Sequence, residues 1–125
     1  MENNSHKILL VEDDPTLLEM YSIKAKEDGL NLIEAEDGLT GLELAQQELP
    51  DVILLDIMMP KMDGFAVLTE LKKDEKTKNI PVVMLTNLGQ KADVEKGKKL
   101  GAVDYVVKAS MTPTQVIEKA KSYLK

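Results

Sequence analysis

The sequence predicts a doubly wound α/β fold, in which helices cover both faces of a five-stranded parallel sheet. Five short apolar segments alternate along the chain with five segments of helical periodicity. The apolar segments are continuous rather than alternating, which is typical of strands that are buried on both faces. The 125 residues contain no linker, repeat or low-complexity segment, so we expect a single domain over residues 1–125.

The predicted strands are short and rich in aliphatic residues. The clearest is 52–55, which runs directly into Asp56, and the weakest is 32–35, which Glu34 interrupts. Apolar strands separated by helices indicate parallel pairing. The predicted strands cover residues 8–11, 32–35, 52–55, 81–85 and 103–107.

Residues that favour helix termini separate these strands. Asp14 is the expected N-cap of the first helix, with Pro15 at its first position. Thr112 and Gln115 form a capping box at the start of the last helix. The second helix is expected to open at Asp37, the third to cover 65–73 and the fourth 90–100. Residues that stop helices follow the first, second and fourth: Gly29, Pro50 and Gly101.

Helical spacing assigns an apolar face to three of these helices. Residues on one face of the helix are expected to pack against the sheet. These are Leu17, Leu18, Tyr21 and Ala25 in the first helix, Leu39, Leu42 and Ala45 in the second, and Val116, Ile117, Ala120 and Leu124 in the last.

Composition argues against several functional classes. There is no cysteine and the only histidine is His6, so thiolate sites, zinc sites and histidine-based catalysis are not expected. The net charge of −6, the absence of Trp and the single Phe argue against direct nucleic-acid binding. No apolar run approaches about 18 residues, so no membrane span is expected. Residues 1–6 are polar, are expected to be flexible and do not form a signal peptide, which favours a cytoplasmic protein.

Charged and hydroxyl-bearing residues stand where four of the predicted strands end. In an open parallel sheet the ligand site lies beyond the carboxyl ends of the strands, so these side chains are expected to converge. They are Glu12, Asp13 and Asp14 after the first strand, Asp56 after the third, Thr86 after the fourth and Lys108 after the fifth.

This set of side chains indicates phosphoryl transfer. Crowded carboxylates repel one another unless a cation lies between them, and Mg²⁺ is bound by carboxylate, water and phosphate oxygens. Thr86 and Lys108 are suitable donors to phosphoryl oxygens. An aspartate can act as the nucleophile and form an aspartyl phosphate. Asp56 is the best candidate, because it ends the most apolar strand.

The motifs resemble the receiver domains of two-component response regulators over essentially the whole chain. Those that match occupy residues 11–14, 54–56, 59–64, 85–86, 101–102 and 104–108. The resemblance implies a flavodoxin-like sheet with strand order 2-1-3-4-5, an order of which a chemotaxis receiver is a known example.

The resemblance also implies a role for each residue of the site. Asp56 would be the phospho-acceptor, and Mg²⁺ would be held by Asp13, Asp56, the backbone carbonyl of Met58 and, often through water, Glu12. Thr86 and Lys108 would bind the phosphoryl group. Tyr105 would be an aromatic switch that turns inward when Thr86 moves.

The resemblance implies a signalling protein rather than a turnover enzyme. The phosphoryl donor would be a sensor histidine kinase or a histidine phosphotransfer protein, and the chain would catalyse only its own phosphorylation and slow autodephosphorylation. Phosphorylation would signal to a downstream protein through the face formed by the fourth helix, the fifth strand and the fifth helix. The sequence leaves open whether the chain acts alone or as part of a longer protein.

Two departures from the family pattern lie beside the site. Ala109 follows Lys108 where the family usually has proline, which leaves open whether this peptide bond is cis or trans. Asn87 follows Thr86 where a small residue is frequent, so it could narrow access to Asp56. In addition, Met58 and Leu88 occupy positions that tune autodephosphorylation in the family. Because both are apolar, we hypothesise a long-lived phosphorylated state.

Two alternatives stand beside this interpretation. One is a pseudo-receiver that binds partners without being phosphorylated, although no essential acid, threonine or lysine is missing. The other is a hydrolase of the haloacid dehalogenase type, which needs a second aspartate two residues after the nucleophile. Met58 occupies that position, which argues against the hydrolase.

Overall fold

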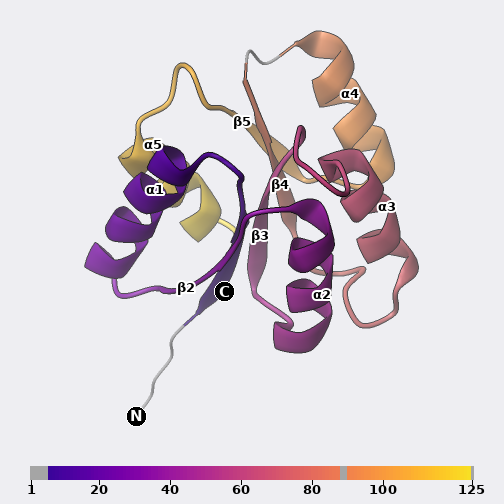
Figure 1. Cartoon of the computed structure of the whole chain (residues 1–125), viewed down its shortest axis with the longest axis horizontal. Coiled ribbons are helices and arrows are strands. Elements are labelled where there is room, and N and C mark those ends of the chain that lie inside the picture. Colours follow the sequence, from indigo (N-terminus) through magenta and orange to yellow (C-terminus); the bar gives the residue numbers. More distant parts are fainter. Residues whose placement is uncertain (1–5, 88–89, 125) are drawn as a thin grey trace.

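The protein forms the predicted sheet flanked by five helices (Figure 1). The structure, a computed structural model, describes residues 6–87 and 90–124, so the segment predicted to be flexible lies outside it except for His6. The elements are β1 Lys7–Val11, α1 Pro15–Glu27, β2 Asn31–Ala35, α2 Gly38–Glu48, β3 Val52–Asp56, α3 Gly64–Lys73, β4 Val82–Thr86, α4 Lys91–Leu100, β5 Asp104–Val107 and α5 Pro113–Lys121.

All strands of the sheet are parallel and lie in the order β2-β1-β3-β4-β5, as the resemblance implies. The central strand, β3, pairs with β1 on one side and with β4 on the other. Every residue of β3 and of β4 is buried. The continuous apolar runs therefore reflect burial on both faces, which is why these strands do not alternate in polarity.

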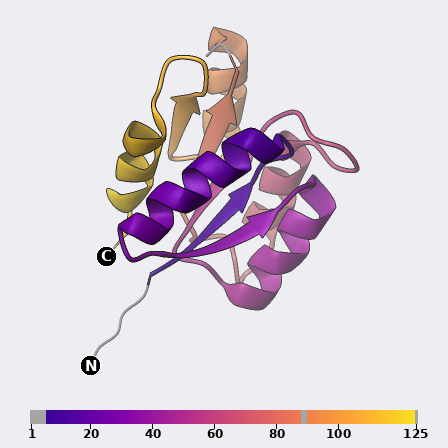
Figure 2. The same cartoon turned by 60° about the vertical axis from the view of Figure 1, so that its left-hand side comes forward.

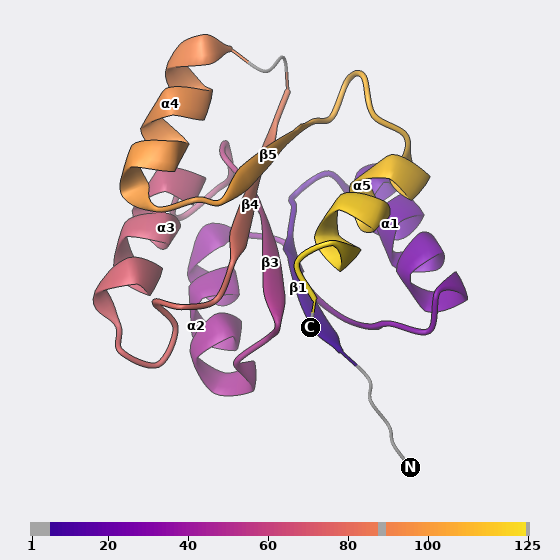
Figure 3. The same ribbon diagram turned by 180° about the vertical axis from the view of Figure 1, so that it is seen from behind.

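Helices cover both faces of the sheet. α1 and α5 lie on one face, and α2, α3 and α4 lie on the other (Figures 1 and 3). On the first face, Leu10 and Leu54 pack with Leu18 and Ile117. On the second face, alternate residues of the same strands pack mainly against α2 and α3. Within residues 6–87 and 90–124, no helix is long and apolar enough to cross a membrane.

Helix α1 begins as the sequence predicts, and it crosses the sheet in Figure 2. The Asp14 side chain accepts hydrogen bonds from the backbone N–H groups of Thr16 (2.9 Å) and Leu17 (3.3 Å), and Pro15 occupies the first helical position. Pro15 suits this place because its missing N–H would have no partner within the helix. The capping box of α5 is also present: Thr112 and Gln115 exchange hydrogen bonds of 2.9 and 3.1 Å.

Two of the predicted apolar faces need correction. Leu39 is 46% exposed, because α2 turns Gly38, Gly41 and Ala45 toward the interior instead. A Cβ at Gly41 would overlap the Val11 side chain, so close packing of this helix on β1 favours glycine there. Leu124 lies beyond the end of α5, although it still packs against the α1/α5 core as a half-buried residue. The other two residues predicted for this face of α2, Leu42 and Ala45, do pack in the core, so only Leu39 was misplaced.

A substitution at Gly64 tests how closely α3 packs beside β3. A Cβ at this position would overlap the carbonyl oxygen of Asp56, whereas Gly29 has open space around it and a φ of +75°. We expect Gly64→Ala to lower the free energy of unfolding by about 2–3 kcal/mol through overpacking, and Gly29→Ala by about 1 kcal/mol through backbone strain. Urea denaturation of both variants measures this difference, and equal losses would contradict it.

Candidate phosphoryl-acceptor site

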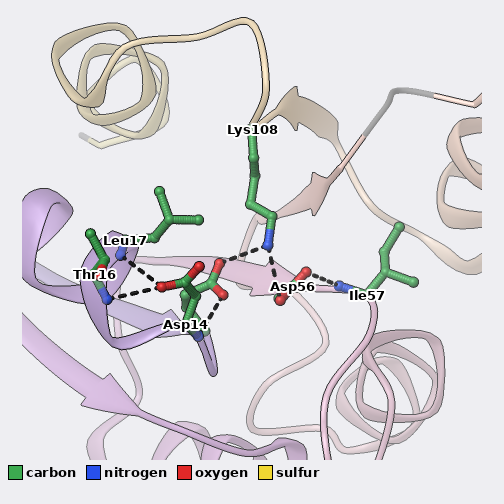
Figure 4. A network of polar contacts seen from close by, with 7 residues as sticks. Asp14, Thr16, Leu17, Asp56, Ile57 and Lys108 are labelled. Carbon is green, nitrogen blue, oxygen red and sulfur yellow. Dashed lines mark hydrogen bonds and ion pairs between the residues drawn. The ribbon is translucent and has the colours of Figure 1, made fainter.

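The carboxyl ends of the strands bring predicted side chains together, and Figure 4 shows Lys108 pointing toward Asp56. Glu12 and Lys108 directly follow β1 and β5, and Asp56 and Thr86 are the last residues of β3 and β4. The ladder hydrogen bonds continue past the strands, because the backbone N–H of Glu12 donates to Ala35 (3.0 Å). The backbone N–H of Lys108 donates to the carbonyl oxygen of Thr86 (2.8 Å), which fixes the backbones of these two residues relative to each other.

The Lys108 ammonium group lies between two buried carboxylates. Its Nζ is 3.0 Å from Oε1 of Glu12 and 3.1 Å from Oδ2 of Asp56. Glu12 is completely buried and Asp56 is 3% exposed. The other oxygen of each carboxylate is also bonded, since Oε2 of Glu12 accepts from the backbone of Asp14 (2.9 Å). The Asp56 partner is the backbone N–H of Ile57, which donates to Oδ1 at 2.8 Å. The Asp56 carboxylate is therefore held in one orientation at the end of a rigid strand.

One ammonium group does not neutralise this site. Burial and then the Glu12 carboxylate raise the pKa of Asp56 to about 7, and Lys108 offsets only part of this effect. Burial alone lowers the pKa of Lys108, yet the two acids beside it raise it overall. Both pKa shifts have the same cause. Two carboxylates stabilise the charged form of Lys108, whereas Asp56 shares the one ammonium group with Glu12. A further cation would relieve this imbalance.

Three carboxylates are placed to hold such a cation. One oxygen from each of Glu12, Asp13 and Asp56 lies within 4.8 Å of the others. Asp13 is exposed while the other two are buried, so the group is open to water on one side. Oxygen ligands with access to water suit Mg²⁺, which keeps several of its water molecules. The donor set therefore fits the predicted metal, and Asp14 serves the helix as its N-cap, as expected.

Met58 lies beside Asp56, whereas Tyr105 stands within β5 and packs against the core on the α2/α3 side of the sheet. Tyr105 is half-buried in β5, and Nζ of Lys98 in α4 is 5.7 Å from the centre of its ring. The Met58 side chain is 73% exposed. Asp56 opens onto a hollow of about 160 Å³ whose other lining residues are Ile57, Met58, Asn87, Gln90 and Asp93.

The hollow includes two residues that the sequence interpretation missed. Gln90 and Asp93 lie at the start of α4, whereas the prediction considered only residues at strand ends. The sequence did carry a signal for them, because the first turn of a helix that follows a strand lies at the same edge of the sheet as the end of that strand. Asn87 does line the way to Asp56, as expected, while Leu88 lies outside the described residues. The Lys108–Ala109 peptide bond is trans, as are all those that the structure describes, which resolves the alternative that the sequence left open.

Comparisons with known proteins agree with this geometry. Residues 8–121 match the family model described as "Response regulator receiver domain". Over 102 residues the chain is 46% identical to the DNA-binding dual master transcriptional regulator RpaA of Synechocystis sp., a match that covers 82% of this chain and 42% of RpaA. The chain spans between 39% and 51% of the length of RpaA and of the transcriptional regulators named ycf27 that it also matches.

Solved structures show the same fold. The chemotaxis response regulator CheY4 of Vibrio cholerae superposes with a TM-score of 0.89 at 28% identity, covering 97% of this chain and 100% of that one. The Mn²⁺-bound form of the response regulator Rcp1 superposes with a TM-score of 0.77 at 32% identity, covering 94% and 88% of the two chains.

The raised pKa of Asp56 predicts how stability depends on pH without metal. Between pH 4 and about 7, Asp56 keeps its proton in the folded protein but has lost it in the unfolded chain. The free energy of unfolding therefore falls as the pH rises through this window. Asp56→Asn removes this titration. At pH 8 in EDTA we expect the variant to be more stable than wild type by about 2–4 kcal/mol, given about 1.4 kcal/mol per pKa unit.

Urea unfolding of both proteins from pH 4 to pH 8 tests this expectation. The difference should shrink toward pH 4, where Asp56 is protonated in the folded protein and about half protonated in the unfolded chain. Saturating Mg²⁺ should narrow the difference at pH 8. A difference that does not change with pH would contradict titration of Asp56 as its cause.

Proposed function

We propose that this chain, which belongs to the response regulator receiver domain family, accepts a phosphoryl group on Asp56 from a phosphohistidine donor. The carrying observation is the placement of Lys108 between two buried carboxylates at the strand ends, 3.0 Å from Glu12 and 3.1 Å from Asp56. Asp56 is the nucleophile because its carboxylate is fixed and lies on the hollow through which a donor can approach.

The reaction exchanges one bond to phosphorus for another. An Asp56 carboxylate oxygen forms a bond to phosphorus while the bond from phosphorus to the donor imidazole nitrogen breaks, and the imidazole leaves with the electron pair. The Lys108 ammonium stabilises the negative charge of the transferring group. The backbone N–H of Ile57 holds the carboxylate in place. Positioning and electrostatics thus carry most of the catalysis.

Mg²⁺ is the metal that we assign to the acidic group. Glu12, Asp13 and Asp56 would hold it, with the Met58 carbonyl as a further ligand. When bound, Mg²⁺ offsets the negative charge of the acids and of the incoming phosphoryl group. The Mn²⁺-bound form of the structural relative Rcp1 supports a divalent metal in this fold.

Phosphorylation would act as a switch. The new dianion attracts Lys108 and the Thr86 hydroxyl, and Tyr105 moves inward as Thr86 shifts. Tyr105 is suited to report this change because it lies in β5 with Lys98 of α4 near its ring. We assign the surface of α4, β5 and α5 as the face that contacts a downstream protein.

The partners follow from the chemistry of the donor. A sensor histidine kinase or a histidine phosphotransfer protein supplies the phosphoryl group in the cytoplasm, and the chain performs one transfer rather than sustained turnover. RpaA is named as a DNA-binding regulator, but this chain spans only 42% of it. We propose that the chain itself acts through protein contacts and does not bind nucleic acid directly.

Intact mass spectrometry after incubation with acetyl phosphate tests the phospho-acceptor. Wild type should gain one phosphoryl group only when Mg²⁺ is present, and Asp56→Asn should gain none. Asp14→Asn is the matched control, because it also removes a carboxylate beside the site but keeps a residue that caps α1. It should be labelled like wild type.

Either of two results would overturn the assignment. Equal labelling of Asp56→Asn would place the phosphoryl group elsewhere. No labelling of wild type would favour the pseudo-receiver, which binds partners without phosphorylation.

The Met58 side chain predicts a slow loss of the phosphoryl group. It is exposed beside Asp56 and has no polar group to orient a hydrolytic water. We expect a half-life of minutes or longer with Mg²⁺, and decay about tenfold faster in Met58→Asn, whose amide can position water. A quench-and-mass time course measures both rates. Decay of wild type within seconds would exclude this explanation.

A further inference from the structure

Tyr21 carries a buried hydroxyl group that the proposed reaction does not use. The residue is 1% exposed and belongs to the core between the sheet and helices α1 and α5. Within residues 6–87 and 90–124, its hydroxyl oxygen is the only fully buried side-chain nitrogen or oxygen atom without a hydrogen-bond partner. Since buried polar groups in folded proteins are almost always bonded, this hydroxyl requires a physical explanation.

The ion cluster of the site lies on the same side of the sheet as Tyr21. Side chains alternate between the two faces of a strand, so residues two apart point to the same face. Glu12, Asp56 and Lys108 each come two residues after a strand residue of the core that contains Tyr21. Those strand residues are Leu10, Leu54 and Val106.

The charges of the site act on the Tyr21 hydroxyl. Burial raises its pKa, and among the charged neighbours the Glu12 carboxylate has the largest effect, in the same direction. The next largest effects come from Lys108, which lowers the pKa of Tyr21, and from Asp56, which raises it. Glu12 is therefore the charge that the hydroxyl senses most strongly, and a phenol hydroxyl is a suitable donor to a carboxylate.

Glu12 depends on Lys108 for one of its hydrogen bonds. In the structure Oε1 accepts from Lys108 Nζ and Oε2 accepts from the backbone N–H of Asp14. Glu12 offers the metal one oxygen. With Mg²⁺ held through Oε2, a phosphoryl group on Asp56 that draws Lys108 away leaves Oε1 buried and without its charged donor. A buried carboxylate oxygen without a donor is unfavourable, so a replacement donor would stabilise the phosphorylated form.

We propose that Tyr21 is this replacement: its hydroxyl donates to the Glu12 carboxylate when Lys108 turns to the phosphoryl group on Asp56. Tyr21 is thus a positioning residue that touches neither the phosphoryl group nor the metal. Its unbonded hydroxyl raises the energy of the resting protein, and its bonded hydroxyl lowers the energy of the phosphorylated one. This role of Tyr21 rests on the proposed function of Asp56.

Tyr21→Phe removes only the hydroxyl group and tests this role. Without ligand, the variant should unfold at the same or a higher temperature than wild type, because no hydrogen bond is lost. With saturating Mg²⁺, its Kd for beryllofluoride, a stable mimic of the phosphoryl group, should be about tenfold weaker, as for the loss of one hydrogen bond to a charged group. Thermal unfolding and calorimetric titration give the two readouts.

Tyr123→Phe is the matched control. It removes a tyrosine hydroxyl that donates to Asp104 at 2.7 Å, away from the ion cluster. This variant should lose stability without ligand and bind beryllofluoride like wild type.

Two results for Tyr21→Phe would overturn the proposal. One is a Kd equal to that of wild type. The other is a loss of stability without ligand as large as in Tyr123→Phe, which would mean that the hydroxyl is already bonded at rest. The wild-type titration alone judges the proposed function: if wild type does not bind beryllofluoride, both the proposed function and the role of Tyr21 are wrong.

Discussion

The site depends on a buried arrangement of two carboxylates, Glu12 and Asp56, around the single ammonium group of Lys108. Such an arrangement disfavours the ionised form of Asp56, because burial and the Glu12 carboxylate raise its pKa to about 7 despite the lysine beside it. The apolar strands on which these residues stand must supply the stability that the cluster costs. A cation beside the cluster would relieve this imbalance.

The fold supplies both the rigidity and the convergence that this cluster needs. Parallel strands end at one edge of the sheet, so residues 96 positions apart, such as Glu12 and Lys108, meet there. β3 and β4 are buried throughout, and the ladder bond from Lys108 to Thr86 ties the lysine to the neighbouring strand. The acid, the lysine and the hydroxyl are therefore placed by backbone pairing rather than by flexible loops.

The sequence was sufficient wherever a residue type has a local physical cause. Asp14 and Thr112 cap helices because their side chains bond nearby backbone N–H groups, and acids that end apolar strands need a reason to be there. The sequence was insufficient where the packing of helices on the sheet decides whether a side chain is exposed or bonded. Leu39 is exposed because α2 packs through small residues. The hydroxyl of Tyr21, on the buried face of α1, has no hydrogen-bond partner in the part of the chain that the structure describes. Periodicity alone placed Tyr21 in the core but gave no sign of its unbonded hydroxyl.

A resting state that is not fully satisfied suits a switch. A ligand can shift a conformational equilibrium only by its difference in affinity for the two states. Groups that are strained or unbonded in the unphosphorylated protein enlarge this difference in affinity, although they make no contact with the ligand. Asp56, whose ionised form is disfavoured, and Tyr21, whose hydroxyl is buried without a partner, both raise the energy of the resting protein. The apolar core tolerates both. Under the proposed function and the proposed role of Tyr21, the energy released when a cation and a phosphoryl group satisfy them would be available to move the surface that a partner contacts.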